Sequence, residues 1–225
     1  MKTALYTTLF LDGMDDRCNS RFGRALKWVK YYAALKEELG FDEFVFCDDG
    51  SNPEFIKLFL AYVESTKIPY KFIAQINLKG TNTNYDYPWC WRGIWEMRNL
   101  LDDYSRLISI ESDFFILSQD LIDHTRNMQS GWWSILEHQY NWPESAFHVL
   151  NEDAYDLFRD FTSQPWKPLL GLCLETSLPF TAVYSNFNYA RFGEKLLQQT
   201  PGMDAYGQCP TDIDMKFRLS ESGQV

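Results

Sequence analysis

The sequence predicts an α/β fold, in which helices flank a mainly parallel central sheet. Two observations carry this prediction. Short segments rich in β-branched and aromatic residues alternate with longer segments whose apolar residues recur at helical spacing, as is typical of βαβ units. The chain also has 225 residues, a length that one α/β domain fills, so we expect a single domain over residues 1–225.

The first βα unit and the strand after it are predicted over residues 3–51. Residues 3–10 are rich in β-branched and aromatic types and are short enough for a buried strand. From 19 to 39 the apolar residues take up helical spacing, and Gly40 stands where a C-cap glycine belongs. A second strand, 41–47, then ends in the turn-forming run Asp48-Asp49-Gly50-Ser51.

Two further βα pairs follow at similar spacing. Asn52 and Pro53 are typical of an N-cap and a first helical residue, and they precede an apolar stripe of helical period. Residues 70–76 are predicted as a third strand, and 91–103 as the next helix. Residues 107–117 are a strongly apolar fourth strand, interrupted by Glu111, Ser112 and Asp113.

The second half of the chain is less regular. Residues 131–150 are compatible with one strand or two, 151–161 with a helix capped by Asn151, and 170–187 with either type of element. An aromatic cluster in this half either lines a ligand-binding groove or packs in the core, and it comprises Trp132, Trp133, Tyr140 and Trp142.

Composition and charge exclude several classes of partner. Lys and Arg total 21 against 31 Asp and Glu, so the net charge of −10 opposes binding to nucleic acid or to an anionic membrane surface. A phosphorylated small molecule would need local arginines or a bound cation to offset this acidity at its site. The P-loop, dinucleotide-binding and G-x-S-x-G motifs are absent from the sequence.

Cysteine usage and hydropathy bear on the location of the protein. The five cysteines are odd in number and include no C-x-x-C pair, which favours reduced thiols over disulfides or a zinc site. The amino terminus lacks the apolar region of a signal peptide, and no stretch is long and apolar enough to span a bilayer. We therefore expect a cytoplasmic protein without a transmembrane segment.

Two carboxylates, Glu111 and Asp113, interrupt the predicted fourth strand. Residues two apart in a strand share one side, and like charges on a buried side require a compensating partner. A hard cation such as Mn²⁺ or Mg²⁺, shared with a substrate diphosphate, would be that partner. The alternative is that the strand ends at Ile110 and both acids lie in solvent.

Asp48 and Asp49 end the second strand at the same predicted edge of the sheet, which is the edge where ligands of parallel sheets bind.

The order of these features resembles the nucleotide-binding half of GT-A glycosyltransferases. The resemblance covers residues 3–118, about half the chain, and implies a nucleoside-diphosphate sugar as the donor. It places Thr7 and Thr8 beside the nucleoside, Asp49 with Asp48 on the base or ribose, and Asp113 on the metal.

One position departs from the family pattern. The usual Asp-x-Asp is Glu111-Ser112-Asp113 in this chain, so Glu111 is expected on the ribose, on the metal or on a metal-bound water, and metal dependence is less secure.

Two arginines of the helix before the fourth strand are candidates for donor binding. Arg92 and Arg98 stand where related enzymes often carry an arginine near the donor. The alternative is that they form exposed i, i+4 pairs with Glu96 and Asp102.

An inverting transfer also needs a carboxylate base beside the acceptor hydroxyl. We assign residues 119–225 to the acceptor side, and there the candidates are Glu175, in an apolar neighbourhood, followed by Asp153 and Asp212. Glu152 and Asp214 are weaker candidates of the same kind.

The predicted function is therefore metal-assisted transfer of a sugar to an acceptor hydroxyl of a glycan, a lipid-linked molecule or a protein. One alternative is a sugar-nucleotidyltransferase, which would be expected to carry a Gly-rich basic loop after the first strand, whereas residues 12–17 are acidic. The other is a carbohydrate- or nucleotide-binding domain of the same fold without turnover.

Overall fold

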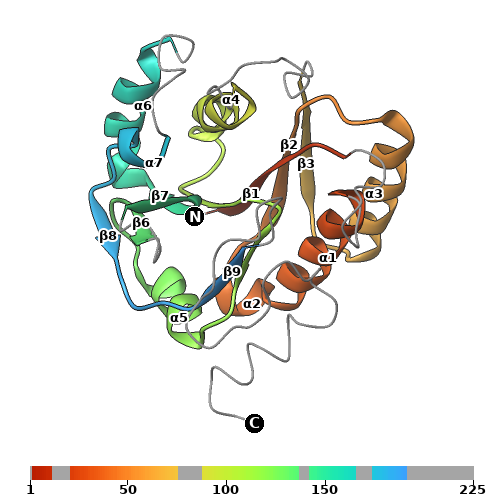
Figure 1. Ribbon diagram of the computed structural model, residues 1–225, viewed down its shortest axis with the longest axis horizontal. Helices are drawn as coiled ribbons and strands as arrows, with labels where there is room; N and C mark the ends of the chain where they lie inside the picture. Colours follow the sequence, from red (N-terminus) through yellow and green to blue (C-terminus); the bar gives the residue numbers. More distant parts are fainter. Residues whose placement is uncertain (1, 12–20, 76–87, 137–141, 166–173, 192–225) are drawn as a thin grey trace.

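Figure 1 shows the computed structural model, which describes residues 2–11, 21–75, 88–136, 142–165 and 174–191. A seven-stranded sheet runs through this part of the chain, in the order β3-β2-β1-β4-β7-β6-β8. Its strands are β1 (Thr3–Leu9), β2 (Glu43–Asp48), β3 (Tyr70–Ala74), β4 (Arg106–Ile110), β6 (Trp132–Leu136), β7 (Pro143–Asn151) and β8 (Ala182–Tyr184).

The sheet is mainly parallel. β1 pairs in parallel with β2 and β4, β2 with β3, and β6 with β8. Of these seven strands, β7 is the one that runs antiparallel to its neighbours, β4 and β6. The predicted α/β fold with a mainly parallel sheet is confirmed.

Helices cover both faces of the sheet (Figure 1). One face carries α1 (Arg21–Ala34), α2 (Lys36–Leu39), α3 (Pro53–Ser65) and α5 (Gln119–Asn127). The other face carries α4 (Pro88–Glu96), the 3-10 helix η1 (Met97–Leu100) and α6 (Tyr155–Ser163). The remaining short helices are η2 (Glu152–Ala154) and α7 (Leu174–Ser177).

The two-residue period of β1 divides the core into two apolar clusters. Leu5 and Leu9 point to one side, where they join the cluster of Trp28 on α1. Ala4 and Tyr6 point to the other, where they join the cluster that α4, η1 and α6 complete. Burial on both faces explains why Ala4, Leu5 and Tyr6 form an uninterrupted apolar run in this strand.

Local sequence signals predicted two helix ends correctly and one helix cap wrongly. Gly40 has φ +70° at the end of α2, in the left-handed conformation of a C-cap. The side chain of Asn52 accepts a hydrogen bond from the amide of Glu54 at 2.9 Å, so it caps α3. Asn151 does not cap a helix as predicted, because it is the last residue of β7 and its side chain donates to the carbonyl of Gly131 at 2.9 Å.

The predicted fourth strand, residues 107–117, divides into two in the structure. β4 ends at Ile110, the chain turns through residues 111–113, and β5 (Phe114–Ile116) leaves the main sheet to pair with β9 (Tyr189–Arg191). The prediction that Glu111 and Asp113 share one side of a single strand is therefore wrong. The alternative is correct in one part, because the strand does end at Ile110, but both side chains are partly buried in the turn.

The aromatic cluster of the second half belongs mainly to the core. Trp132 and Trp133 on β6 are fully buried, on opposite faces of the sheet. Trp142 is partly buried, and Tyr140 lies outside the described residues. The two buried tryptophans therefore pack in the interior instead of lining an acceptor groove.

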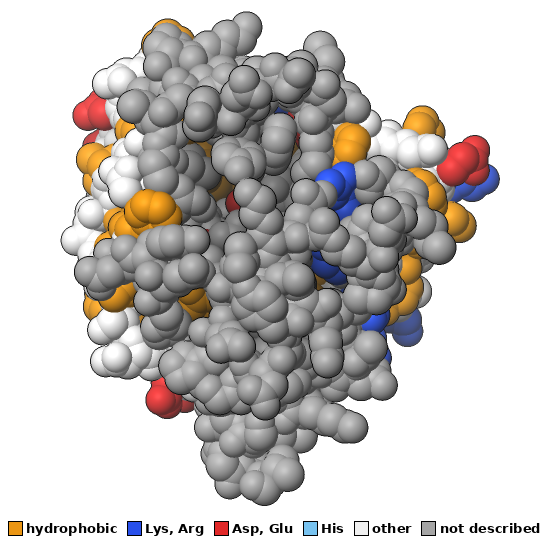
Figure 2. All heavy atoms as spheres, in the orientation of Figure 1, with side chains coloured by type: hydrophobic (Ala, Val, Ile, Leu, Met, Phe, Trp, Pro, Cys, Tyr) orange, Lys and Arg blue, Asp and Glu red, His pale blue; other side chains and the backbone are white. Residues whose placement is uncertain are grey.

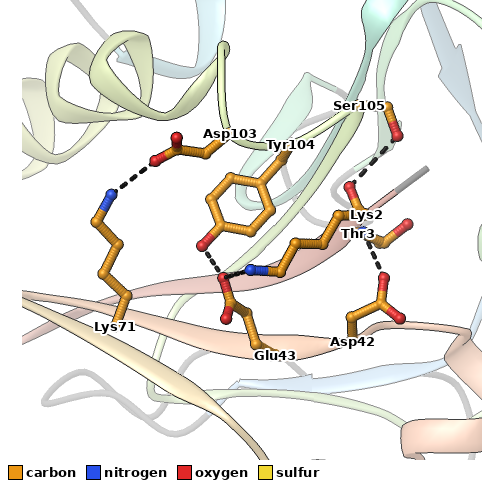
Figure 3. A network of polar contacts seen from close by, with 8 residues as sticks. All are labelled: Lys2, Thr3, Asp42, Glu43, Lys71, Asp103, Tyr104 and Ser105. Atoms are coloured by element: carbon orange, nitrogen blue, oxygen red, sulfur yellow. Dashed lines mark hydrogen bonds and ion pairs between the residues drawn. The ribbon is translucent and has the colours of Figure 1, made fainter.

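Polar contacts tie together the amino edge of the parallel strands (Figure 3). The hydroxyl of Tyr104, in the loop before β4, donates to Glu43, whose carboxylate also lies 2.7 Å from the ammonium of Lys2. Lys71 on β3 pairs with Asp103 at 2.9 Å. These contacts hold the starts of the parallel strands in place.

No helix within the described residues has the length and apolar character required to cross a membrane.

Candidate functional site

A cavity opens at the carboxyl edge of the sheet, where β1 lies between β2 and β4. The strand order reverses at this point, because β2 and β3 lie on one side of β1 and β4 lies on the other. In open α/β sheets, ligands bind at such a switch point. The polar and charged residues that line the cavity are Thr8, Arg21, Arg24, Asp49, Arg92, Glu111, Ser112 and Asp113.

The turn after β2 divides its two aspartates between two roles. The carboxylate of Asp48 accepts hydrogen bonds from the amides of Gly50 and Ser51 at 3.1 and 3.0 Å, and from the hydroxyl of Ser51. It therefore holds the turn, in which Gly50 has φ +80°. Asp49 follows Asp48 and lines the cavity, so of the two carboxylates it is the one placed for a ligand.

Asp49 forms an ion pair with Arg92 of α4. The side chains are 7% and 12% exposed, so both charges lie mostly out of water and each offsets the desolvation of the other. Burial lowers the pKa of Arg92 from its usual value. The predicted alternative, an exposed Arg92–Glu96 pair, is replaced by this contact across the cavity.

Gly93 allows α4 to lie close enough to β1 for that pairing. A Cβ at this position would stand 2.4 Å from Cγ2 of Thr8, a separation that real side chains do not show. The hydroxyl of Tyr6 donates to the carbonyl of Gly93 at 2.6 Å and fixes the same approach. Arg92 is thus aimed into the cavity by the packing of its neighbour.

Glu111 and Asp113 line the cavity from the turn between β4 and β5. The amide of Glu111 donates to the carbonyl of Ala146 on β7 at 2.8 Å, and the carbonyl of Glu111 accepts from Phe114 at 3.0 Å. The turn is therefore anchored on both sides. Glu111 also borders a smaller adjoining pocket with the hydroxyl-bearing residues Tyr6, Thr8, Ser109 and Ser145.

Two arginines in the cavity were missed by the sequence reasoning. Arg21 and Arg24 lie at the start of α1, and both line the cavity. The guanidinium of Arg21 also lies over the ring of Phe10, 5.6 Å from its centroid. The signal was available, because residues three apart share a helix face and this helix follows the first strand.

The charges around the cavity balance. Among the described residues of the lining, Arg21, Arg24 and Arg92 face Asp49, Glu111 and Asp113, so their charges sum to zero in a chain of net charge −10. The local arginines that a phosphorylated ligand requires are therefore present.

The fit of a divalent cation rests on two carboxylates. Glu111 and Asp113 offer the oxygen ligands that Mn²⁺ or Mg²⁺ prefers. Among the described residues, no three His, Cys, Asp or Glu side chains converge on one point. The two acids fit such an ion in the way common for Mg²⁺, with one or two carboxylates completed by substrate phosphates and water.

Other predicted site residues do not line this cavity. Thr7 is buried, with its hydroxyl 3.4 Å from the carbonyl oxygen of Thr8. Arg98 is exposed and donates to the carbonyl of Thr162 at 3.1 Å. Asp153 lies at the opposite edge of the sheet, where its carboxylate accepts from the amide of Gly131 at 2.8 Å.

The remaining base candidates fall at the limits of the described chain. The backbone of Glu175 lies in α7, which packs near β7, but its side chain is outside the described part. Asp212 lies wholly outside the described residues.

Cys47 also lines the cavity, but burial lowers the reactivity of its thiol. Burial raises the pKa of its thiol to about 11, so it remains protonated at neutral pH.

No protein-family model matches the chain, and no curated protein is similar to it in sequence. Similarity appears in the fold, at 8–10% sequence identity in three solved structures. A protein described as a glucose-1-phosphate thymidylyltransferase of Bacillus anthracis has a TM-score of 0.56, with 100% of this chain and 96% of that one covered. An active-site mutant of LgtC has a TM-score of 0.51, with 81% and 72% covered. A 4-diphosphocytidyl-2C-methyl-D-erythritol synthase of Anaerococcus prevotii has a TM-score of 0.50, with 97% and 95% covered.

These likenesses show the fold. The chain has a GT-A-like, Rossmann-like fold.

Proposed function

We propose that this chain is a glycosyltransferase that moves a sugar from a nucleoside-diphosphate sugar to an acceptor hydroxyl. The observation that carries the proposal is the convergence of Asp49, Arg92, Glu111 and Asp113 on one cavity at the switch point of a GT-A-like sheet. The acceptor is a glycan, a lipid-linked molecule or a protein, and the cytoplasm is the proposed location.

In this proposal each element of the cavity has one task. Asp49 accepts hydrogen bonds from the ribose or base, with Thr8 beside it, while Arg92 holds the Asp49 carboxylate in place. Glu111 and Asp113 would hold Mn²⁺ or Mg²⁺, which would supply positive charge to the leaving diphosphate. The buried turn and the packed α4 preorganise these groups before a ligand arrives.

An inverting form of this transfer requires a base on the acceptor side. The acceptor oxygen forms a bond to the anomeric carbon as the bond from that carbon to the phosphate oxygen breaks. The nucleoside diphosphate leaves, and the acceptor proton passes to a carboxylate. Glu175 remains our candidate for that carboxylate, since α7 belongs to the acceptor-side half.

The proposal is tested with Asp113→Ala. With Mn²⁺ present, this variant should lose sugar transfer and also the Mn²⁺-dependent thermal stabilisation by a nucleoside diphosphate, because the carboxylate that holds the ion is gone. Transfer is measured as nucleoside diphosphate released from a panel of sugar nucleotides. Asp160→Ala, at an exposed position of α6, is the matched control and should behave as the parent. Unchanged metal-dependent stabilisation in Asp113→Ala would remove the metal assignment.

A sugar-nucleotidyltransferase is the second candidate, and one observation favours it. The likeness to the thymidylyltransferase structure covers nearly the full length of both chains. That reaction consumes a nucleoside triphosphate and a sugar phosphate and releases pyrophosphate. Pyrophosphate release, without nucleoside diphosphate release from sugar nucleotides, would replace the glycosyltransferase proposal with this one.

A further inference from the structure

The arginines of the cavity differ in their contacts. Arg92 is paired with Asp49, and the guanidinium of Arg21 lies over Phe10. Arg24 is partly buried, lines the cavity, and has a buried Nε without a hydrogen-bond partner among the described residues. A buried donor without a partner is costly, and it is satisfied when an acceptor enters beside it.

The surroundings indicate which acceptor would enter. Asp49, Glu111 and Asp113 repel an anion, and Arg92 is already neutralised by its partner. An anionic group in this cavity therefore needs a cation that is still available on the α1 side. Figure 2 shows Lys and Arg side chains, in blue, on the side of the molecule where α1 and α3 lie. A guanidinium also offers several donors in the geometry that phosphate oxygens accept.

We propose that Arg24 binds the phosphate groups of the nucleotide directly, so that a nucleoside diphosphate binds this cavity even without a divalent cation. The inference rests on the proposed function and names a binding residue for it. Arg24 meets the phosphates from α1, whereas Glu111 and Asp113, in the β4–β5 turn, would hold the divalent cation. The two contributions are separable, because they come from different elements of the cavity lining, α1 and the turn between β4 and β5.

The test measures nucleotide binding in EDTA by calorimetry. UDP, GDP, ADP, CDP and dTDP are titrated into the parent protein, and the tightest of them is compared with its own nucleoside and with inorganic pyrophosphate. Arg24→Gln should weaken the diphosphate and pyrophosphate by about tenfold to a hundredfold, the usual effect of losing a hydrogen bond between charged groups. The affinity for the nucleoside should not change.

Two further variants control for charge and folding. Arg24→Lys keeps the charge and should recover part of the affinity. Lys30→Gln removes a positive charge from an exposed position of the same helix and should bind as the parent does. An equal loss for the nucleoside, parental diphosphate affinity in Arg24→Gln, or no diphosphate binding by the parent in EDTA would each overturn the inference.

The outcomes also separate this inference from the proposed function. A parent that transfers sugar, with an Arg24→Gln variant that binds diphosphate normally, removes the role of Arg24 alone. A parent that transfers no sugar, with a diphosphate-specific loss in Arg24→Gln, removes the transferase proposal and supports the role of Arg24.

Discussion

At the scale of single residues, polar groups in this chain were predictable where their partners are local. Asn52 caps α3 through an amide two residues away, and Asp48 is held by the turn that follows it. Arg92 shows the limit. Its local partner, Glu96, is visible in the sequence, but its ion-pair partner Asp49 is 43 residues earlier in the chain. Pairing at that separation depends on how α4 packs on β1, which periodicity does not reveal.

His148 yields a residue-scale prediction about pH. It is fully buried on β7, its Nδ1 accepts from the indole of Trp132 at 3.2 Å, and burial lowers its pKa to about 3. The unfolded chain therefore takes up a proton near pH 6.5 that the folded chain refuses. Above pH 6.5 the histidine is neutral in both states, so it costs the folded protein no stability. As the pH falls from 6.5 toward 3, the free energy of unfolding decreases by up to about 1.4 kcal/mol per pH unit.

The measurement is urea unfolding at several pH values between 7 and 4. In His148→Gln the free energy of unfolding should fall less steeply with decreasing pH than in the parent, whatever its value at pH 7. A variant with the slope of the parent would mean that other groups govern the acid sensitivity.

At the scale of elements, the sequence predicted the positions of the helices and strands better than it predicted which strands pair. The apolar run of residues 107–117 has the composition of one buried strand, and the sequence pattern gives no sign that β5 leaves the main sheet for β9. The direction of β7 was equally hidden, because strand pairing is set by contacts between distant segments. The acidic turn therefore appeared in the right place but in the wrong conformation.

The contact of α4 with β1 gives a prediction at this scale. Gly93→Ala should lower the free energy of unfolding by about 1–3 kcal/mol and weaken nucleotide binding, because the added methyl forces α4, and Arg92 with it, away from Thr8. Urea unfolding and calorimetry are the measurements. Thr8→Ala in the same chain removes the clashing Cγ2 and should recover part of the lost stability. A double variant no more stable than Gly93→Ala would show that the cost lies elsewhere in α4.

At the scale of the whole molecule, the first half of the chain, up to residue 118, and the second half share one sheet. β4 of the first half pairs with β7 of the second over five residues, from Arg106 with Asn151 to Ile110 with Phe147. Across that boundary the hydroxyl of Tyr155 also donates to the carbonyl of Tyr104 at 2.6 Å. Length alone predicted one domain, and this shared sheet supports that expectation.

Cooperative unfolding tests the single domain. Leu100 belongs to the first half and Leu121 to the second; both are fully buried, in the two clusters on opposite faces of the sheet. Leu100→Ala and Leu121→Ala should each cost about 2–5 kcal/mol. Each should move one common urea transition, with tryptophan fluorescence and far-ultraviolet circular dichroism reporting the same midpoint. Two separate transitions, with each variant shifting only one, would show instead that the halves fold independently and that the β4–β7 pairing is too weak to couple them.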